Sequence, residues 1–131
     1  MPLTVQIVDE VNPGAKEAIG ALEMLEERTT PRELIRARVY QEVTEYNARR
    51  AGPFRGLVQP TEAERVLNGF ALKPGRTIDW QAQYERAIEA FSRRGFLLLV
   101  DDRQLVDLDD DIDIHPGSEV TFLRLVPLVG G

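Results

Sequence analysis

The most constraining local signal in this chain is a helix start at Thr30-Pro31-Arg32-Glu33. Thr30 supplies a hydroxyl that can accept from a backbone N–H, Pro31 suits the first helical position, and Glu33 completes a capping box. Behind this start, apolar residues recur every three or four positions and form one stripe: Ile35, Val39, Val43 and Tyr46. The spacing predicts a helix of about four turns with one buried side, ending near residues 47–48.

Strand patterns precede this helix. Residues 3–8 alternate between polar and apolar types and are rich in β-branched side chains, while residues 18–25 form a second apolar stretch. Asn12-Pro13-Gly14 between them has strong turn chemistry. We therefore expect an N-terminal hairpin.

The last third of the chain is also typical of strands. Residues 96–100 form a continuous apolar run, as in a strand buried on both faces, and Asp101-Asp102 mark a tight turn into residues 103–106. Residues 119–126 read as the final strand, which Pro127 ends because proline has no N–H to donate to the sheet. Together with the helix, these strands predict an α+β fold.

Residues 48–95 read as a helical insertion within one domain that spans residues 1–131. Thr61-Glu62-Ala63-Glu64 has the form of a second capping box and predicts a short helix that stops at Asn68-Gly69. Asp79 can cap a further helix that stops at Gly95. The apolar stripe of that helix is typical of core packing onto the main domain and consists of Trp80, Tyr84, Ile88 and Phe91.

The composition narrows the class of protein. A chain of 131 residues that is 43% hydrophobic and 29% charged can bury a core as one domain. It has no cysteine, no visible signal peptide and no apolar run long enough to cross a bilayer, so we expect a cytoplasmic protein without a membrane partner. The formal net charge of −6 argues against nucleic acid as a partner. Only Lys16 and Lys73 are lysines; this fits codon usage in a GC-rich genome, or a chain that modifies lysines and carries few itself.

No catalytic constellation is visible, so we expect no enzymatic activity and no bound metal. His115 is the only histidine, and neither Ser92 nor Ser118 has a plausible base nearby in the sequence. The acidic series lacks the glycine, the terminal Glu and the flanking helices of a calcium loop, and we interpret it as a solvated turn that a basic partner surface could use. Its members are Asp101, Asp102, Asp107, Asp109, Asp110, Asp111 and Asp113.

The order of elements and three short stretches resemble the β-grasp superfamily of ubiquitin, the small subunit of molybdopterin synthase and the thiamine sulfur carrier. Residues 100–105, Val-Asp-Asp-Arg-Gln-Leu, resemble a turn and short strand of ubiquitin, and residues 116–122, Pro-Gly-Ser-Glu-Val-Thr-Phe, are similar to the last strand of the sulfur carriers. The ending Val129-Gly130-Gly131 is shared by both groups. The resemblance implies a mixed sheet wrapped on one main helix, and residues 48–94 have no counterpart in it.

The resemblance further implies that the carboxylate of Gly131 is the working group, on a flexible tail over residues 127–131. An E1-like activating enzyme would use ATP and magnesium to activate this carboxylate. Gly130 and Gly131 suit that role, because they let the backbone pass through a narrow channel where a side chain would clash. Nothing would be bound by this chain itself. Further partners would be an E2-like carrier, a deconjugating protease and an acceptor protein whose amine receives the chain.

Two other functions stay open beside that of a protein modifier. The chain could be a sulfur carrier whose Gly131 becomes a thiocarboxylate, or a binding module that is not conjugated. In each case we expect a docking patch beside the tail, because the apolar residues of the final strand cannot all face one core. Its candidates are Leu123, Leu125, Val126, Pro127, Leu128 and Val129. A bulged strand that buries them all is the equally weighted alternative.

Overall fold

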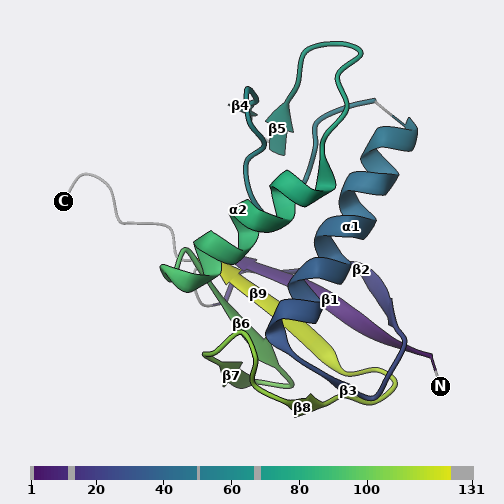
Figure 1. The fold of residues 1–131 in the computed structure, drawn as a ribbon, viewed down its shortest axis with the longest axis vertical. Helices are drawn as coiled ribbons and strands as arrows, with labels where there is room; N and C mark the ends of the chain where they lie inside the picture. The colour runs from purple at the N-terminus through teal and green to yellow at the C-terminus, as the bar shows by residue number, and fades with distance from the viewer. Residues whose placement is uncertain (1, 12–13, 50, 67–68, 125–131) are drawn as a thin grey trace. The chain divides into compact units, whose positions relative to one another are not determined.

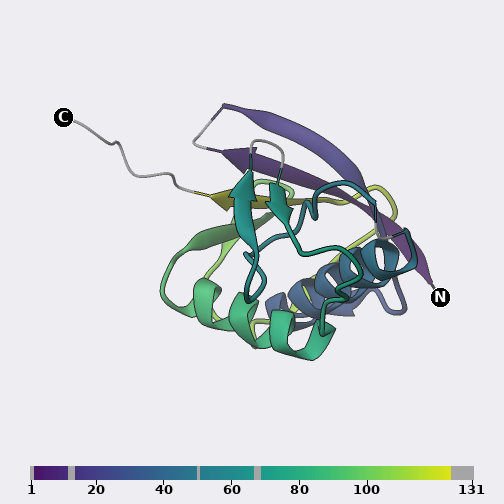
Figure 2. The same cartoon turned by 90° about the horizontal axis from the view of Figure 1, so that it is seen from above.

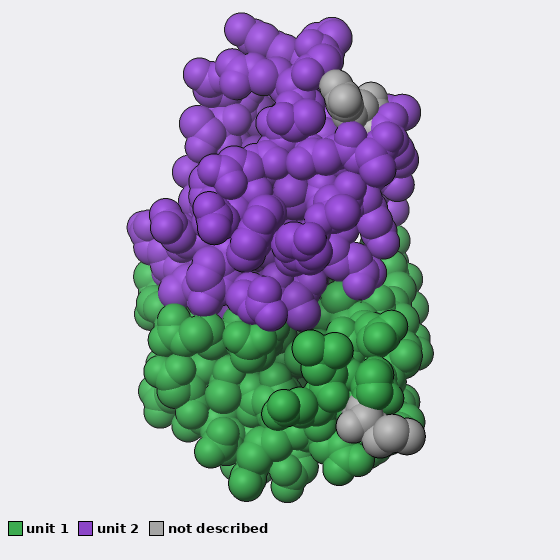
Figure 3. All heavy atoms as spheres, turned by 45° about the vertical axis from the view of Figure 1, so that its right-hand side comes forward, with its two compact units in different colours: residues 1–34, 91–131 green, residues 35–90 purple. Residues whose placement is uncertain are grey.

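The structure is a computed structural model that describes residues 2–11, 14–49, 51–66 and 69–124. The chain divides into two compact units, coloured separately in Figure 3. Unit 1 comprises residues 1–34 and 91–131, and unit 2 comprises residues 35–90. Within the described ranges, no helix has both the length and the apolar character needed to cross a membrane.

Unit 1 is built on a mixed five-stranded sheet, so the α+β class is confirmed (Figures 1 and 2). The sheet order is β2-β1-β9-β6-β7, in which β1 and β9 run parallel and the other neighbours run antiparallel. The strands are β1 (Leu3–Val11), β2 (Lys16–Met24), β6 (Phe96–Val100), β7 (Arg103–Leu105) and β9 (Glu119–Arg124). A two-stranded ladder joins β3 (Arg28–Thr29) to β8 (Ile112–Asp113).

The predicted N-terminal hairpin is confirmed. Leu3 pairs with Met24 and Glu10 with Lys16, with a bulge in the register after Ile7. Of the predicted turn, Gly14 has a φ of +106°, which favours glycine, whereas Asn12 and Pro13 lie outside the described residues. The hairpin buries one side of β1, because its alternating residues face the core.

The two-residue turn from β6 into β7 is also confirmed. Asp101 and Asp102 have φ values of +48° and +70°, the pair of left-handed residues that a type I′ turn requires. The Asp101 side chain accepts from Glu119 N at 2.9 Å, and Asp101 N donates to Glu119 O at 2.9 Å. The turn is thereby tied to the first residue of β9.

The main helix α1 (Pro31–Arg49) begins where the capping residues predict. Thr30 Oγ1 accepts from Glu33 N at 3.2 Å, and the N–H of Arg32 donates to Leu108 O at 3.0 Å. Two of the N–H groups that have no partner within the helix are thus satisfied. The predicted stripe is confirmed, since Ile35, Val39, Val43 and Tyr46 are all buried.

The short helix predicted from residue 61 is wrong. Residues here form a hairpin of β4 (Glu64–Val66) and β5 (Gly69–Ala71) instead. Glu62 has a left-handed φ of +61° and pairs with Arg76, so it cannot occupy the first turn of a helix. Asn68 lies outside the described residues.

Gly69 of β5 allows a close backbone approach. Phe54 and Phe70 exchange backbone hydrogen bonds of 2.8 and 2.9 Å, and a Cβ on Gly69 would lie 2.4 Å from Phe54 O. The pairing between segments that are distant in the sequence therefore determines the conformation here, and the local capping pattern does not.

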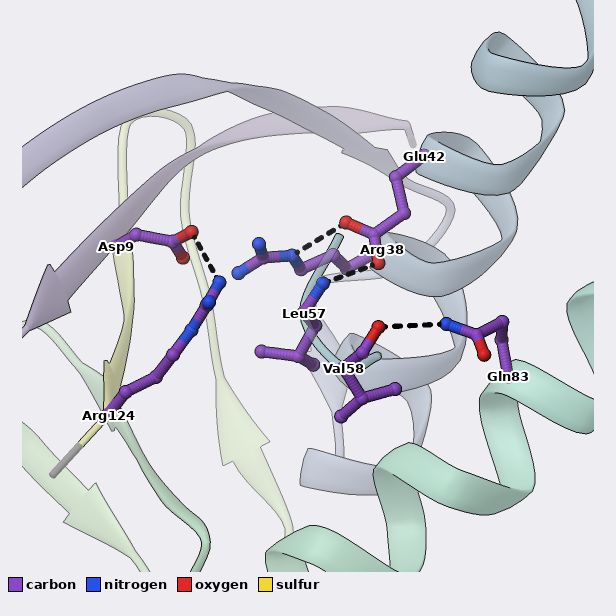
Figure 4. Close-up of polar contacts among 7 residues, drawn as sticks. All are labelled: Asp9, Arg38, Glu42, Leu57, Val58, Gln83 and Arg124. Atoms are coloured by element: carbon purple, nitrogen blue, oxygen red, sulfur yellow. Dashed lines mark hydrogen bonds and ion pairs between the residues drawn. The ribbon is translucent and has the colours of Figure 1, made fainter. Parts of the chain in front are cut away.

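The second predicted helix is confirmed as α2 (Trp80–Ser92), with the Asp79 carboxylate accepting from Gln81 N at 3.0 Å. Its most buried positions differ from the predicted stripe, in which only Phe91 is fully buried. The other buried positions of α2 are Gln83, Ala87 and Ala90, none of which belongs to the predicted stripe. Gln83 can be buried because its amide Nε2 donates to Val58 O at 3.1 Å (Figure 4).

The predicted stop of α2 at Gly95 is shifted by one residue. Arg94, and not Gly95, has the left-handed φ of +64°, and its N–H donates to Phe91 O at 3.1 Å. The Arg94 side chain also donates to Val106 O at 3.3 Å. A left-handed conformation in a residue with a Cβ costs about 1–2 kcal/mol.

Candidate functional site

One face of the unit 1 sheet carries apolar side chains beside the predicted docking residue Leu123. Successive residues of a strand point to opposite faces, so Leu123 lies on the face opposite to Phe122. In register with it are Leu97 on β6 and Glu10 on β1, while Thr121 pairs with Leu99 and Val8. We name Val8, Leu97, Leu99 and Leu123 the sheet-face patch.

The patch is partly accessible. Leu97, Leu99 and Leu123 are half-buried, whereas Val8 is buried at 8% exposure and Phe122 on the other face is fully buried. The register of β9 with both neighbours is regular from Glu119 to Arg124, so the bulge that we considered does not occur in this part of the strand. The remaining candidates, Leu125, Val126, Pro127, Leu128, Val129, Gly130 and Gly131, lie outside the described residues.

Sequence reasoning missed three members of the sheet-face patch. Residues 96–100 were expected to be buried on both faces, but Leu97 and Leu99 are half-buried while Phe96, Leu98 and Val100 are buried. The apolar run alone cannot distinguish these cases. The alternation of polar and apolar residues in β9, which pairs with β6, distinguishes these cases once the strand order is known.

Polar residues border the sheet-face patch. Glu10 is 8% exposed, and its carboxylate accepts from Gly14 N at 2.7 Å. Lys16 lies opposite it on β2, and Glu119 lies at the first position of β9. Charged residues therefore adjoin the apolar side chains of the patch, although Glu10 among them is buried.

The end of β9 carries a shielded ion pair (Figure 4). Arg124 Nη2 lies 3.0 Å from Asp9 Oδ2, and the two side chains are 30% and 15% exposed. Arg124 is in register with Val11 and Phe96, and Asp9 with Phe122, so the pair lies on the core side of the sheet.

The acidic series meets basic residues of the same unit. Asp109 accepts from Arg32 at 3.0 and 3.2 Å, and Arg28 lies 3.6 Å from Asp113. The hydrogen bonds from Arg32, more than its charge, lower the pKa of the Asp109 carboxyl from its ordinary value. Among the described residues, no three potential ligands gather to hold a metal ion.

His115 and Ser118 do not form a catalytic pair. His115 N donates to Ser118 Oγ at 3.0 Å, and the His115 imidazole lies 3.4 Å from Asp101 and is 69% exposed. Ser118 itself is fully buried. The contact therefore closes a turn through the backbone of His115 and activates no hydroxyl.

Unit 2 has an aromatic cluster of its own. The rings of Tyr40 and Trp80 meet edge to face with centroids 5.2 Å apart, and Tyr84 lies 6.4 Å from Trp80. Tyr40 is 49% exposed and was absent from the predicted stripe.

Comparison of the chain with protein-family models, curated proteins and solved structures finds no match.

Proposed function

We propose that this chain is a β-grasp protein modifier of the ubiquitin-like type, activated at the carboxylate of Gly131. The observation that carries the proposal is the place of β9, which lies between β1 and β6 and leads in the sequence to Val129-Gly130-Gly131. A mixed sheet with this order of elements is what the resemblance implies. The sheet-face patch includes Leu123 of this strand and would give a partner a docking surface.

The chemistry would belong to the partners. A carboxylate oxygen of Gly131 attacks the α-phosphorus of ATP held with magnesium in the activating enzyme, and pyrophosphate leaves. A thiol of the enzyme or carrier then attacks the acyl-adenylate carbonyl and AMP leaves. Finally an acceptor amine attacks the thioester, loses a proton and releases the thiol, which leaves an amide bond. This chain contributes a positioned substrate, not a catalyst.

The place of action that we propose is the cytoplasm, where ATP is present and where a chain without cysteine needs no oxidising conditions. Lysine scarcity is consistent with a modifier, because Lys16 and Lys73 are the only side-chain amines that could compete with an acceptor.

The test is mass analysis of the chain purified from its native host. The expected products are adducts in which Gly131 is joined to the amine of another protein. Removal of Gly131 should abolish them, whereas Lys73→Arg, a matched exposed change, should leave them. A mature chain that continues beyond Gly131, or an ATP-independent product, would refute the proposal.

The sulfur-carrier alternative would appear in the same spectrum as an intact chain with one oxygen replaced by sulfur. The binding-module alternative is favoured by one observation, the accessibility of Leu97 and Leu99. It predicts that Leu97→Ser abolishes function in the host while removal of Gly131 has no effect. Leu25→Ser is the control, since Leu25 is 73% exposed and lies outside the patch.

A further inference from the structure

The side of the sheet that bears the sheet-face patch changes from apolar to acidic along β6 and β9. Leu97 is in register with Leu123, and Leu99, two residues further along β6, is in register with Thr121. The three leucines are half-buried, and Thr121 between them is buried. The next position of β9 on this side is Glu119, which is half-buried. The two strands therefore present leucines at one end and a carboxylate at the other.

The turn between β6 and β7 adds further carboxylates to the acidic end. The Asp101 carboxylate accepts from Glu119 N at 2.9 Å, so Asp101 lies beside the first residue of β9. Asp101 keeps a side chain that is 45% exposed, and Asp102 after it is exposed as well. Three acidic residues thus adjoin the apolar row that Leu99 begins.

Few basic groups oppose these carboxylates. The His115 imidazole lies 3.4 Å from Asp101, and it is a cation only when it is protonated. Arg103 is in register with Val100, whose side chain is buried on the opposite side of the sheet. The acidic end therefore favours a partner that brings positive charge.

The position of the two strands in the sheet restricts the form of this partner. Both β6 and β9 have a neighbouring strand on each side, so their backbone groups are already used within the sheet (Figure 1). A partner on this side contacts side chains only, and a helix suits this because it pairs its own backbone groups. At about 3.3 Å per strand residue, Leu97 lies about 7 Å from Leu99 and about 13 Å from the level of Asp101. At about 1.5 Å per helical residue, these distances correspond to about four and about eight residues.

We propose that this side of β6 and β9 binds an amphipathic helix of a partner protein. Apolar side chains at positions i and i+4 of the helix lie over Leu97 and Leu99. A lysine or arginine at i+8, on the same side of the helix, lies beside Glu119 and Asp101. The apolar contacts supply most of the affinity, and the charges determine in which direction the helix lies. The inference does not require activation of Gly131.

The first experiment selects helical peptides that bind the chain. The probe is a displayed library of alanine-rich helices in which positions i, i+4 and i+8 are randomised. Selected peptides should have apolar residues at i and i+4 and a lysine or arginine at i+8. Selection of any other class of residue at i+8, or of no peptide at all, would overturn the proposal.

The second experiment measures the affinity of a labelled selected peptide by fluorescence anisotropy. Glu119→Lys should weaken binding about tenfold or more through like-charge repulsion, and a peptide with glutamate at i+8 should recover it. Leu99→Ser should weaken binding about tenfold, because an apolar contact is lost. The matched controls are Glu26→Lys, at an exposed position outside this side of the sheet, and Leu25→Ser, where the side chain is 73% exposed; both should match wild type.

Each variant is first shown by circular dichroism to be folded at the assay temperature. Glu119→Lys keeps the backbone hydrogen bonds of this residue, so the charge test stands even if Leu99→Ser does not fold. Unchanged affinity in Glu119→Lys, or an equal loss in Glu26→Lys, contradicts the proposal. Neither measurement uses ATP or an activating enzyme, so the docking proposal can fail while conjugation of Gly131 is observed, and the reverse.

Discussion

Asn47 joins the last turn of α1 to the segment before α2 through two hydrogen bonds. Its amide Nδ2 donates to Ile78 O at 2.9 Å, and its Oδ1 accepts from Ile78 N at 2.9 Å. Asn47→Asp keeps the size and the accepted bond but replaces the donor with an oxygen that faces a carbonyl oxygen. We expect this variant to unfold more easily than wild type.

The magnitude follows from three contributions. One hydrogen bond is lost, at about 1 kcal/mol, and Ile78 O, on a residue that is 7% exposed, is left without this donor, at about 1–3 kcal/mol. A new negative charge in the last turn of a helix costs about 0.5 kcal/mol more. The sum is about 3 kcal/mol at neutral pH. Asn47→Ala loses both hydrogen bonds, so it should cost about 3 kcal/mol or more at either pH, even after about 0.7 kcal/mol of better helix propensity is subtracted.

The assay is urea unfolding, followed by the fluorescence of Trp80, at pH 7 and at pH 3. The introduced carboxyl faces a carbonyl, so its pKa should be higher in the folded state than the unfolded value of about 3.9. The protonated group can donate, so the difference from wild type should be small below that value and should grow as pH rises. Thr44→Asp, an exposed change on the same helix, isolates the charge effect. A loss for Asn47→Asp that is the same at pH 7 and at pH 3 would refute the reasoning.

The remaining predictions concern the backbone and the acidic turn. Gly69→Ala should cost about 3 kcal/mol or more in urea unfolding, since its Cβ would lie 2.4 Å from a backbone oxygen, whereas Gly75→Ala, with open space and a φ of +82°, should cost about 1 kcal/mol. In an NMR titration the Asp109 carboxyl should show a pKa below the ordinary value of about 3.9, and Arg32→Gln should raise this pKa. The stability that the Asp109–Arg32 contact confers is present above the ordinary value and disappears as pH falls through the lowered pKa. Arg94→Gly should unfold no more easily than wild type, because glycine adopts the left-handed φ of +64° without strain and this compensates for the lost side-chain hydrogen bond. Arg94→Ala loses the bond and keeps the strain, so its free energy of unfolding should be about 1 kcal/mol lower than that of wild type.

Local patterns were sufficient where the deciding contacts are themselves local. The capping hydroxyl of Thr30 and the stripe behind it predicted α1 because both act within two turns of one helix. The strands β1, β2, β6 and β9 were predicted because their residues alternate or are continuously apolar. The mixed sheet itself was expected only from the resemblance.

Predictions failed where a distant partner decides the conformation. Glu62 occupies a good capping position, but its pairing with Arg76 and the bonds between Phe54 and Phe70 produce a turn and a hairpin. Arg94, and not Gly95, is the left-handed residue, and its side chain donates to Val106 O. None of these partners is adjacent in the sequence, so no local pattern indicates them.

The candidate site was predictable in part for the same reason. Leu123 follows from the alternation of one strand, and its placement opposite Phe122 needs no other segment. Leu97 joins it only because β6 pairs with β9, and Asp9 meets Arg124 only because β1 runs parallel to β9. Strand order is a long-range property that this sequence does not display.

The parallel pairing of β1 with β9 also bears on how the chain reaches its native state. During synthesis β1 can pair with β2 as soon as both have emerged, but its other edge stays open until the residues of β9 have followed. Such high contact order slows folding, and open strand edges invite aggregation. A chain truncated before residue 119 would leave β1 and β6 each with an open edge. The sheet can therefore be completed only after β9 has been synthesised.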